Sequence, residues 1–182
     1  ADFALLSQYA LSITKTGSGS GTVTSAPAGI DCGSTCSSSY TQGSLVTLTA
    51  AADANSTFTG WSGGGCSGTG SCTTTIDSSG SISAGFAIKT YTINASAGPG
   101  GTISPSGMVT VSQGADQSFS MTANEGYYLS SLVVDDTPVS PQPSYTFNNV
   151  TSEHTIAADF ALLSQYALSI TKTGSGSGTV TS

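Results

Sequence analysis

The sequence predicts an all-β protein in which small β-rich, sandwich-like modules follow one another in an elongated array. Apolar residues alternate with Ser and Thr over several short stretches, which is the period-two pattern of half-buried strands. Clusters of Gly, Pro, Ser and Asn separate these stretches and mark turns. No stretch has a convincing 3.6-residue period, so helix should be minor.

The expected strands span residues 9–13, 46–50, 82–86, 118–121 and 156–162. Ser and Thr fill most positions between the apolar ones, and Thr suits a pleated surface. Turns are expected at 17–21, at 98–101 and at Asp135-Asp136. The inward-facing positions are Tyr9, Leu11, Ile13, Val46, Leu48, Ala50, Ile82, Ala84, Phe86, Phe119, Met121, Ile156, Ala158, Phe160 and Leu162.

Internal repetition defines the organisation of the chain. Residues 158–182 repeat residues 1–25 without a change, an offset of 157 residues. This identity favours a segment of a longer array with a 157-residue unit over a duplication left by cloning. We therefore interpret residues 1–8 as the end of a preceding module B with its joint, and residues 166–182 as the start of a following module A that copies 9–25.

A weaker repeat divides the unit into module A, residues 9–87, and module B, residues 91–160. Both begin with a short strand that leads into a Gly-rich turn, at Gly19-Ser-Gly-Thr-Val23 and at Gly100-Gly-Thr-Ile103. Both end on related phrases, SISAGF at 81–86 and TIAADF at 155–160. The unit is therefore expected to hold two related modules of about 75 residues, each roughly 30 Å across.

The joints between modules are short and lack the composition of a mobile linker. Apolar residues near them are expected to be buried between neighbouring modules, which predicts a semi-rigid string that advances roughly 60–70 Å per unit. The residues assigned to the joints are Phe3, Leu5, Leu6, Ile88, Leu162 and Leu163.

Composition excludes several functional classes. Of 182 residues, 3 are Lys or Arg and 10 are Asp or Glu, which gives a net charge of −7 and argues against nucleic-acid binding. No apolar run approaches the roughly twenty residues of a membrane span, and coiled-coil heptads are missing. The 37% hydrophobic content can support cores, so disorder is not expected.

Four cysteines, Cys32, Cys36, Cys66 and Cys72, indicate an oxidising location. They allow three disulfide connectivities. We favour the local pairs Cys32–Cys36 and Cys66–Cys72, because each pair brackets a Gly/Ser turn, and the second spacing fits a zinc knuckle poorly. Module A has 14 large apolar residues against 20 in module B. Module A should therefore depend on its disulfides and should melt first on reduction.

The chain resembles the divergent InlB B-repeat modules. In module A the resemblance rests on the run from Gly21 to Cys36, on FTGWSG at 58–63 and on CSGTGSC at 66–72. Module B, with GGTISPSG at 100–107, GY at 126–127 and YTFNNVT at 145–151, resembles the cysteine-free branch. The resemblance implies tandem β-rich modules of secreted or surface-anchored bacterial and archaeal proteins, and no catalytic residues.

Three apparent chemical motifs favour ordinary structural roles. The segment Gly60-Trp-Ser-Gly-Gly64 matches the G-x-S-x-G pattern, but that pattern has meaning only at a strand–helix elbow, with an acid and a histidine following. The one histidine, His154, lies in the other module and is expected at the surface. Asp135-Asp136 lacks the spacing of a calcium loop. No enzymatic activity, cofactor or metal site is therefore expected.

Three sequons place possible glycosylation at Asn55, Asn94 and Asn149, if the host glycosylates secreted proteins. A glycan-binding surface would need an exposed aromatic patch. The aromatic candidates are Tyr40, Trp61, Tyr127 and Tyr128, of which Trp61 is expected mostly in the core.

The leading functional hypothesis is a structural component of an extracellular or cell-surface fibre, filament or stalk. Near-identical units give every joint the same geometry, which a uniform filament needs. Its partners would then be adjacent repeats or identical chains, which could pair through exposed sheet edges near the duplicated segment. The alternatives are an adhesin or glycan-binding array that gains avidity from repetition, or a stalk that spaces an enzyme from the cell wall.

Overall fold

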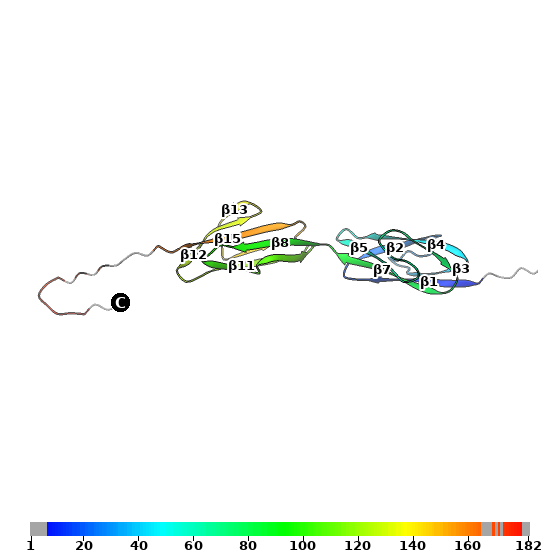
Figure 1. Ribbon diagram of the computed structural model, residues 1–182, viewed down its shortest axis with the longest axis horizontal. Helices are drawn as coiled ribbons and strands as arrows, with labels where there is room; N and C mark the ends of the chain where they lie inside the picture. The colour runs from blue at the N-terminus through cyan, green and yellow to red at the C-terminus, as the bar shows by residue number, and fades with distance from the viewer. Residues whose placement is uncertain (1–6, 165–168, 170, 172, 180–182) are drawn as a thin grey trace, which may run out of the picture.

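The computed structural model describes residues 7–164, 169, 171 and 173–179. Figure 1 shows two β modules arranged end to end along the long axis of the molecule. The part of the chain that the structure describes contains strands and turns and no helix. Within that part, accordingly, there is no helix that could span a membrane.

Module A comprises seven strands in two sheets. One sheet has the order β3-β1-β7-β5 and the other β2-β4-β6. The strands are β1 (Gln8–Thr16), β2 (Gly21–Ala26), β3 (Ser37–Thr41), β4 (Ser44–Ala52), β5 (Ser56–Ser62), β6 (Cys72–Ile76) and β7 (Gly80–Ile88).

Module B repeats this plan with one additional strand. Its sheets have the orders β10-β8-β15-β12-β13 and β14-β11-β9. The strands are β8 (Thr90–Ala97), β9 (Gly101–Ser104), β10 (Gly107–Ser112), β11 (Gln117–Ala123), β12 (Tyr127–Val134), β13 (Thr137–Val139), β14 (Ser144–Phe147) and β15 (His154–Leu162). Without β13 the strand orders of the two modules match one to one, which agrees with the weak internal repeat.

Each module buries its core between its two sheets. In module A, Ile82 and Phe86 of one sheet pack with Val46 and Leu48 of the other, and all four are essentially inaccessible. In module B the core is built in the same way, from residues such as Ile93 and Phe119. These side chains occupy alternate positions along their strands, so the period-two pattern correctly located the cores.

The incoming and outgoing strands of each module lie side by side and run parallel. In module A, β1 pairs with β7 from Leu11↔Gly80 to Thr16↔Gly85. In module B, β8 pairs with β15 from Ile93↔His154 to Ala97↔Ala158. All the other strand pairs in the four sheets of the two modules are antiparallel. The chain therefore enters each module at one pole and leaves it at the opposite pole.

The turn expected at Asp135-Asp136 is a two-residue hairpin between β12 and β13. Both residues have positive φ, 47° and 59°, as in a type I′ turn. The turn closes next to the Val134↔Thr137 pair.

Candidate functional site: the joint between the modules

Lys89 is the single residue between the last strand of module A and the first strand of module B. Its backbone N–H donates to the Asn55 carbonyl of module A at 3.0 Å. Its carbonyl accepts from the Gln113 N–H of module B at 2.8 Å. One peptide segment is thus bound to a loop of each module, so the joint has little length in which to bend.

Two side-chain hydrogen bonds strengthen this joint. The Lys89 ammonium donates to the Ala54 carbonyl at 2.8 Å. The Gln113 Nε2 donates to the Asn55 Oδ1 across the boundary at 2.8 Å. A typical protein hydrogen bond contributes about 1 kcal/mol net. The joint therefore restrains the relative orientation of the modules by polar contacts.

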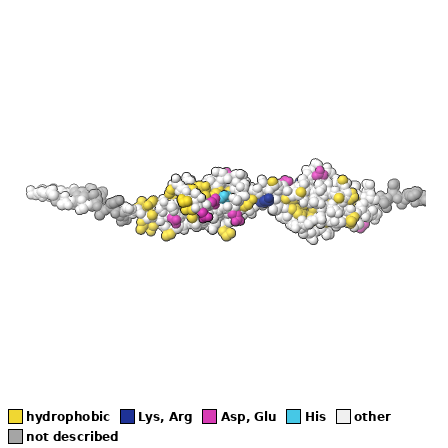
Figure 2. All heavy atoms as spheres, turned by 90° about the horizontal axis from the view of Figure 1, so that it is seen from above, with side chains coloured by type: hydrophobic (Ala, Val, Ile, Leu, Met, Phe, Trp, Pro, Cys, Tyr) yellow, Lys and Arg dark blue, Asp and Glu magenta, His cyan; other side chains and the backbone are white. Residues whose placement is uncertain are grey.

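The joint residues that the sequence suggested differ from those the structure places there. Phe3, Leu5 and Leu6 lie outside the described residues. Ile88 adjoins Lys89 and is 38% exposed, whereas Leu162 and Leu163, expected to be buried, are 68% and 52% exposed. Both extend beyond the core at the far pole of module B, where Figure 2 shows hydrophobic side chains gathered beside the undescribed segment. Their burial against a following module stays a prediction.

Sequence reasoning missed Asn55, Lys89 and Gln113 as joint residues. A signal was present in the polar dipeptide Gln-Gly, which occurs at 42–43 in module A and at 113–114 in module B. In the structure the Gln42 N–H donates to the Ser7 carbonyl, as the Gln113 N–H donates to Lys89. At the far pole of module B the Leu163 N–H donates to the Gly126 carbonyl at 2.7 Å. This bond is equivalent to the one from the Lys89 N–H to the Asn55 carbonyl.

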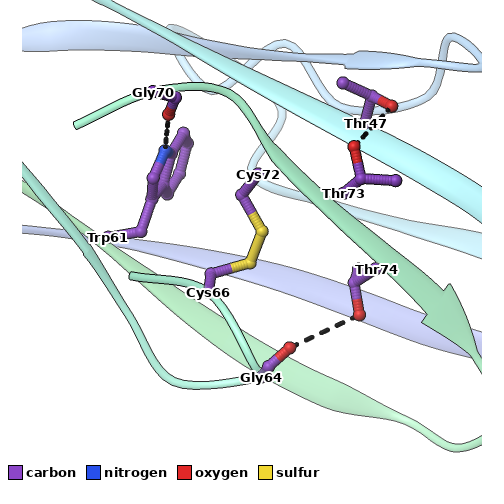
Figure 3. Close-up of a disulfide and its surroundings, with 8 residues drawn as sticks. All are labelled: Thr47, Trp61, Gly64, Cys66, Gly70, Cys72, Thr73 and Thr74. Atoms are coloured by element: carbon purple, nitrogen blue, oxygen red, sulfur yellow. Dashed lines mark hydrogen bonds between the residues drawn. A yellow bond between two sulfur atoms is a disulfide. The ribbon is translucent and has the colours of Figure 1, made fainter. Parts of the chain in front are cut away.

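Both disulfides of module A close local loops, and the pairs are those favoured by spacing. Cys32 bonds to Cys36 between β2 and β3, and Cys66 bonds to Cys72 between β5 and β6. Figure 3 shows Trp61 beside the second loop, where its indole Nε1 donates to the Gly70 carbonyl at 2.6 Å. This loop therefore covers the indole edge and closes one side of the core.

A sequence model of the divergent InlB B-repeat domain matches residues 10–90 and again residues 91–164. These two matches cover most of the chain. The chain belongs to the divergent InlB B-repeat family. Each match coincides with one module, so each β module of this chain, with its parallel incoming and outgoing strands, is one repeat of the family.

Among solved structures, the repeats are similar to the Bacillus anthracis TIE protein, at 8% identity and a TM-score of 0.44. The match covers 84% of this chain and 34% of that one, so the chain spans about a third of that protein. No functionally curated protein gave a match.

The G-x-S-x-G segment of the first B-repeat lies at the end of β5. Trp61 is buried at 4% exposure and packs edge-on against Phe58, while Ser62 is exposed. His154 belongs to the second repeat and contacts Asp135 there. The segment is part of a strand and its turn.

The side chains of His154 and Asp135 are hydrogen-bonded to each other beside the β12–β13 hairpin. The His154 Nδ1 lies 2.7 Å from the Asp135 Oδ2, and the Thr155 N–H donates to the other carboxylate oxygen at 2.8 Å. Desolvation alone would raise the pKa of Asp135, but the Thr155 hydrogen bond and then His154 outweigh it and hold that pKa below its ordinary value. No cluster suited to a metal ion occurs among the described residues.

The sequon and aromatic candidates divide by exposure. Asn55, Asn94 and Asn149 are all exposed, and Asn55 lies in the joint itself. Tyr40 is buried like Trp61, and Tyr127 is half-buried. Tyr128, 48% exposed, is the aromatic candidate left at the surface.

Proposed function

We propose that this chain is a structural segment of an extracellular fibre or stalk assembled from tandem 157-residue units. The observation that carries the proposal is the path of the chain. It crosses each module from pole to pole and passes between modules through one hydrogen-bonded residue, Lys89. Repeats joined in this way continue in line (Figure 1).

The surface and the disulfides support the same role. Figure 2 shows a narrow waist between the modules and few charged side chains. Ser and Thr make up 61 of the 182 residues, which keeps such a surface hydrated with little charge. Two disulfides and membership of a surface-repeat family support an extracellular location.

Identical repeats or chains are the partners that we propose. Among the described residues, the outer strands of both sheets of each module have no strand partner on one side, for example β3 and β5 in module A. The duplicated segment contains β1, which lies between β3 and β7, and most of β2, which is an outer strand of its sheet. Lateral pairing of chains would therefore use the outer strands of the sheets.

Electron microscopy of the native material tests the proposal. We expect continuous threads with an axial repeat of roughly 60–70 Å per two-module unit. Separate particles, or beads whose directions vary freely at each joint, would overturn it.

A glycan-binding or adhesive array is the second candidate, because one aromatic residue is exposed at the far pole of module B. Tyr128 lies there near the exposed Leu162 and Leu163. A glycan array probed with the chain and with Tyr128→Ala tests this role. The matched control is Leu45→Ala, at an exposed apolar residue of module A. Binding that Tyr128→Ala alone abolishes supports the adhesin, and no binding by either protein contradicts it.

A further inference from the structure

The parallel pairing of the incoming and outgoing strands sets how each module responds to tension. In module A, β1 and β7 both run from the first pole to the joint, with six residue pairs in register. In module B, β8 and β15 run in the same way with five. A pull on the two ends of a module draws these two strands in opposite directions along their own length.

This direction of force is the one that a strand ladder resists best. The hydrogen bonds between parallel strands are evenly spaced along the ladder and cross the gap between the strands at a slant, so all of them are loaded when the strands slide past each other. Sliding one strand past the other must therefore break all the bonds of the ladder together. A force that separates the strands from one end breaks the same bonds one after another.

The packing around each ladder adds to its resistance. The two strands are central in their sheet, so each is also paired on its outer side, β1 with β3 and β7 with β5. Side chains along the ladder, such as Ile13 and its partner Ile82, are buried in the core. Sliding β1 would move these side chains out of a close-packed interior.

Turns beyond the ladders extend the contact between the two strands. In module A the Gly19 N–H donates to the Phe86 carbonyl at 2.9 Å, and in module B the Gly98 N–H donates to Ala158 at 2.8 Å. Neither disulfide links the two strands of the ladder, because the bridges close loops between β2 and β3 and between β5 and β6. The resistance must come from non-covalent contacts.

We propose that the β1–β7 and β8–β15 ladders are mechanical clamps, and that the chain's further function is to hold tension along its axis. Lys89 alone separates the outgoing strand of one clamp from the incoming strand of the next, so force passes directly between them. The use of this strength in a fibre rests on the proposed function. The resistance itself is a property of each module.

Single-molecule force spectroscopy on the full chain tests the clamps. In the first geometry the chain is tethered at its two termini, which shears both ladders. In the second geometry the C-terminal tether is moved to a click-reactive residue in place of Glu153, exposed and directly before β15. Module A is still sheared, but the module B ladder is then pulled apart from the pole where β8 begins.

The expected result is a drop in the unfolding force of module B by about twofold or more in the second geometry, because forced unfolding follows the unfolding barrier along the direction of pull. Module A serves as the internal reference and should unfold at the same force in both geometries. The Glu153-substituted chain pulled from its termini controls for destabilisation by the substitution. Equal module B forces in the two geometries would overturn the clamp, whereas a failure to find fibres by microscopy would leave this result unchanged.

Discussion

Reduction of the two disulfides should lower the melting temperature of module A, so that module A melts well before module B. The bridges join residues 4 and 6 positions apart. In the chain-entropy model, loops of this size contribute about 2 kcal/mol each, or about 4 kcal/mol together. A domain of about 80 residues is stable by roughly 4–12 kcal/mol. The loss therefore removes a third or more of the stability of module A, and corresponds to a fall in Tm of roughly 16–32 °C.

Trp61 provides an assay confined to module A, because it is the one tryptophan of the chain. The indole is buried and bonded to Gly70 inside the Cys66–Cys72 loop (Figure 3). Thermal melts with and without reductant, followed by Trp fluorescence, should show the fall in Tm with a red shift. Amide NMR signals of module B in the same sample give the internal control.

Paired alanine variants separate the two bridges. Cys66→Ala with Cys72→Ala should loosen the loop that holds the indole, and should shift the fluorescence even below the melt. Cys32→Ala with Cys36→Ala should lower Tm by a similar amount without that shift. An unchanged Tm of module A under full reduction, or simultaneous loss of both modules, would refute the reasoning.

Three further predictions concern backbone, charge and joint. In denaturant titration, Gly17→Ala should destabilise module A by about 1–3 kcal/mol more than the control Gly43→Ala. Both glycines have positive φ, but only Gly17 packs against the neighbouring strand. Equal losses of stability would contradict this. The pKa of Asp135 is lowered in the folded state, so its stabilisation is complete above the ordinary Asp pKa and is lost as pH falls through the folded value. The Tm of module B should accordingly decrease on acidification, and Asp135→Asn should flatten that dependence; an identical slope in the variant would count against it. Gln113→Ala removes the hydrogen bond to Asn55 and should increase inter-module motion in NMR relaxation, while the unfolding free energy of each module stays within about 0.5 kcal/mol of the parent. Unaltered motion would show that the other hydrogen bonds of the joint are enough to fix it.

The cores could be predicted from the sequence because burial in a sheet is local and alternating. Ile82, Ala84 and Phe86 are all buried on one face of β7, as their spacing indicated. The same reasoning failed for Leu162, which has the right phase but lies beyond the last core layer of module B.

The order of the strands could not be predicted, because it depends on contacts between distant residues. Leu11 pairs with Gly80, 69 positions away, and no local pattern encodes a parallel partner. The polar contacts of the joint between modules A and B were also not predicted, since we looked for apolar residues near the boundaries. These contacts depend on backbone groups, on the Lys89 ammonium and on the polar pair Gln113 and Asn55, which have no periodic signature.

In an array of these units, the joint from module A to module B should be one residue shorter than the joint from module B to the next module A. Between module A and module B, seven positions separate the buried Phe86 from the buried Ile93. After module B, eight positions separate the equivalent Phe160 from position 168, which copies Leu11. Successive residues of an extended chain face opposite sides, so one extra residue turns the next module by about half a turn. Joints of two kinds would then alternate, and the structural repeat of a fibre would be the two-module unit. Deleting Ser164 from a tandem array should make the relative orientation of neighbouring modules the same at both kinds of joint in electron micrographs. Joint orientations that still differ in that variant would show that the spacing does not set the orientation.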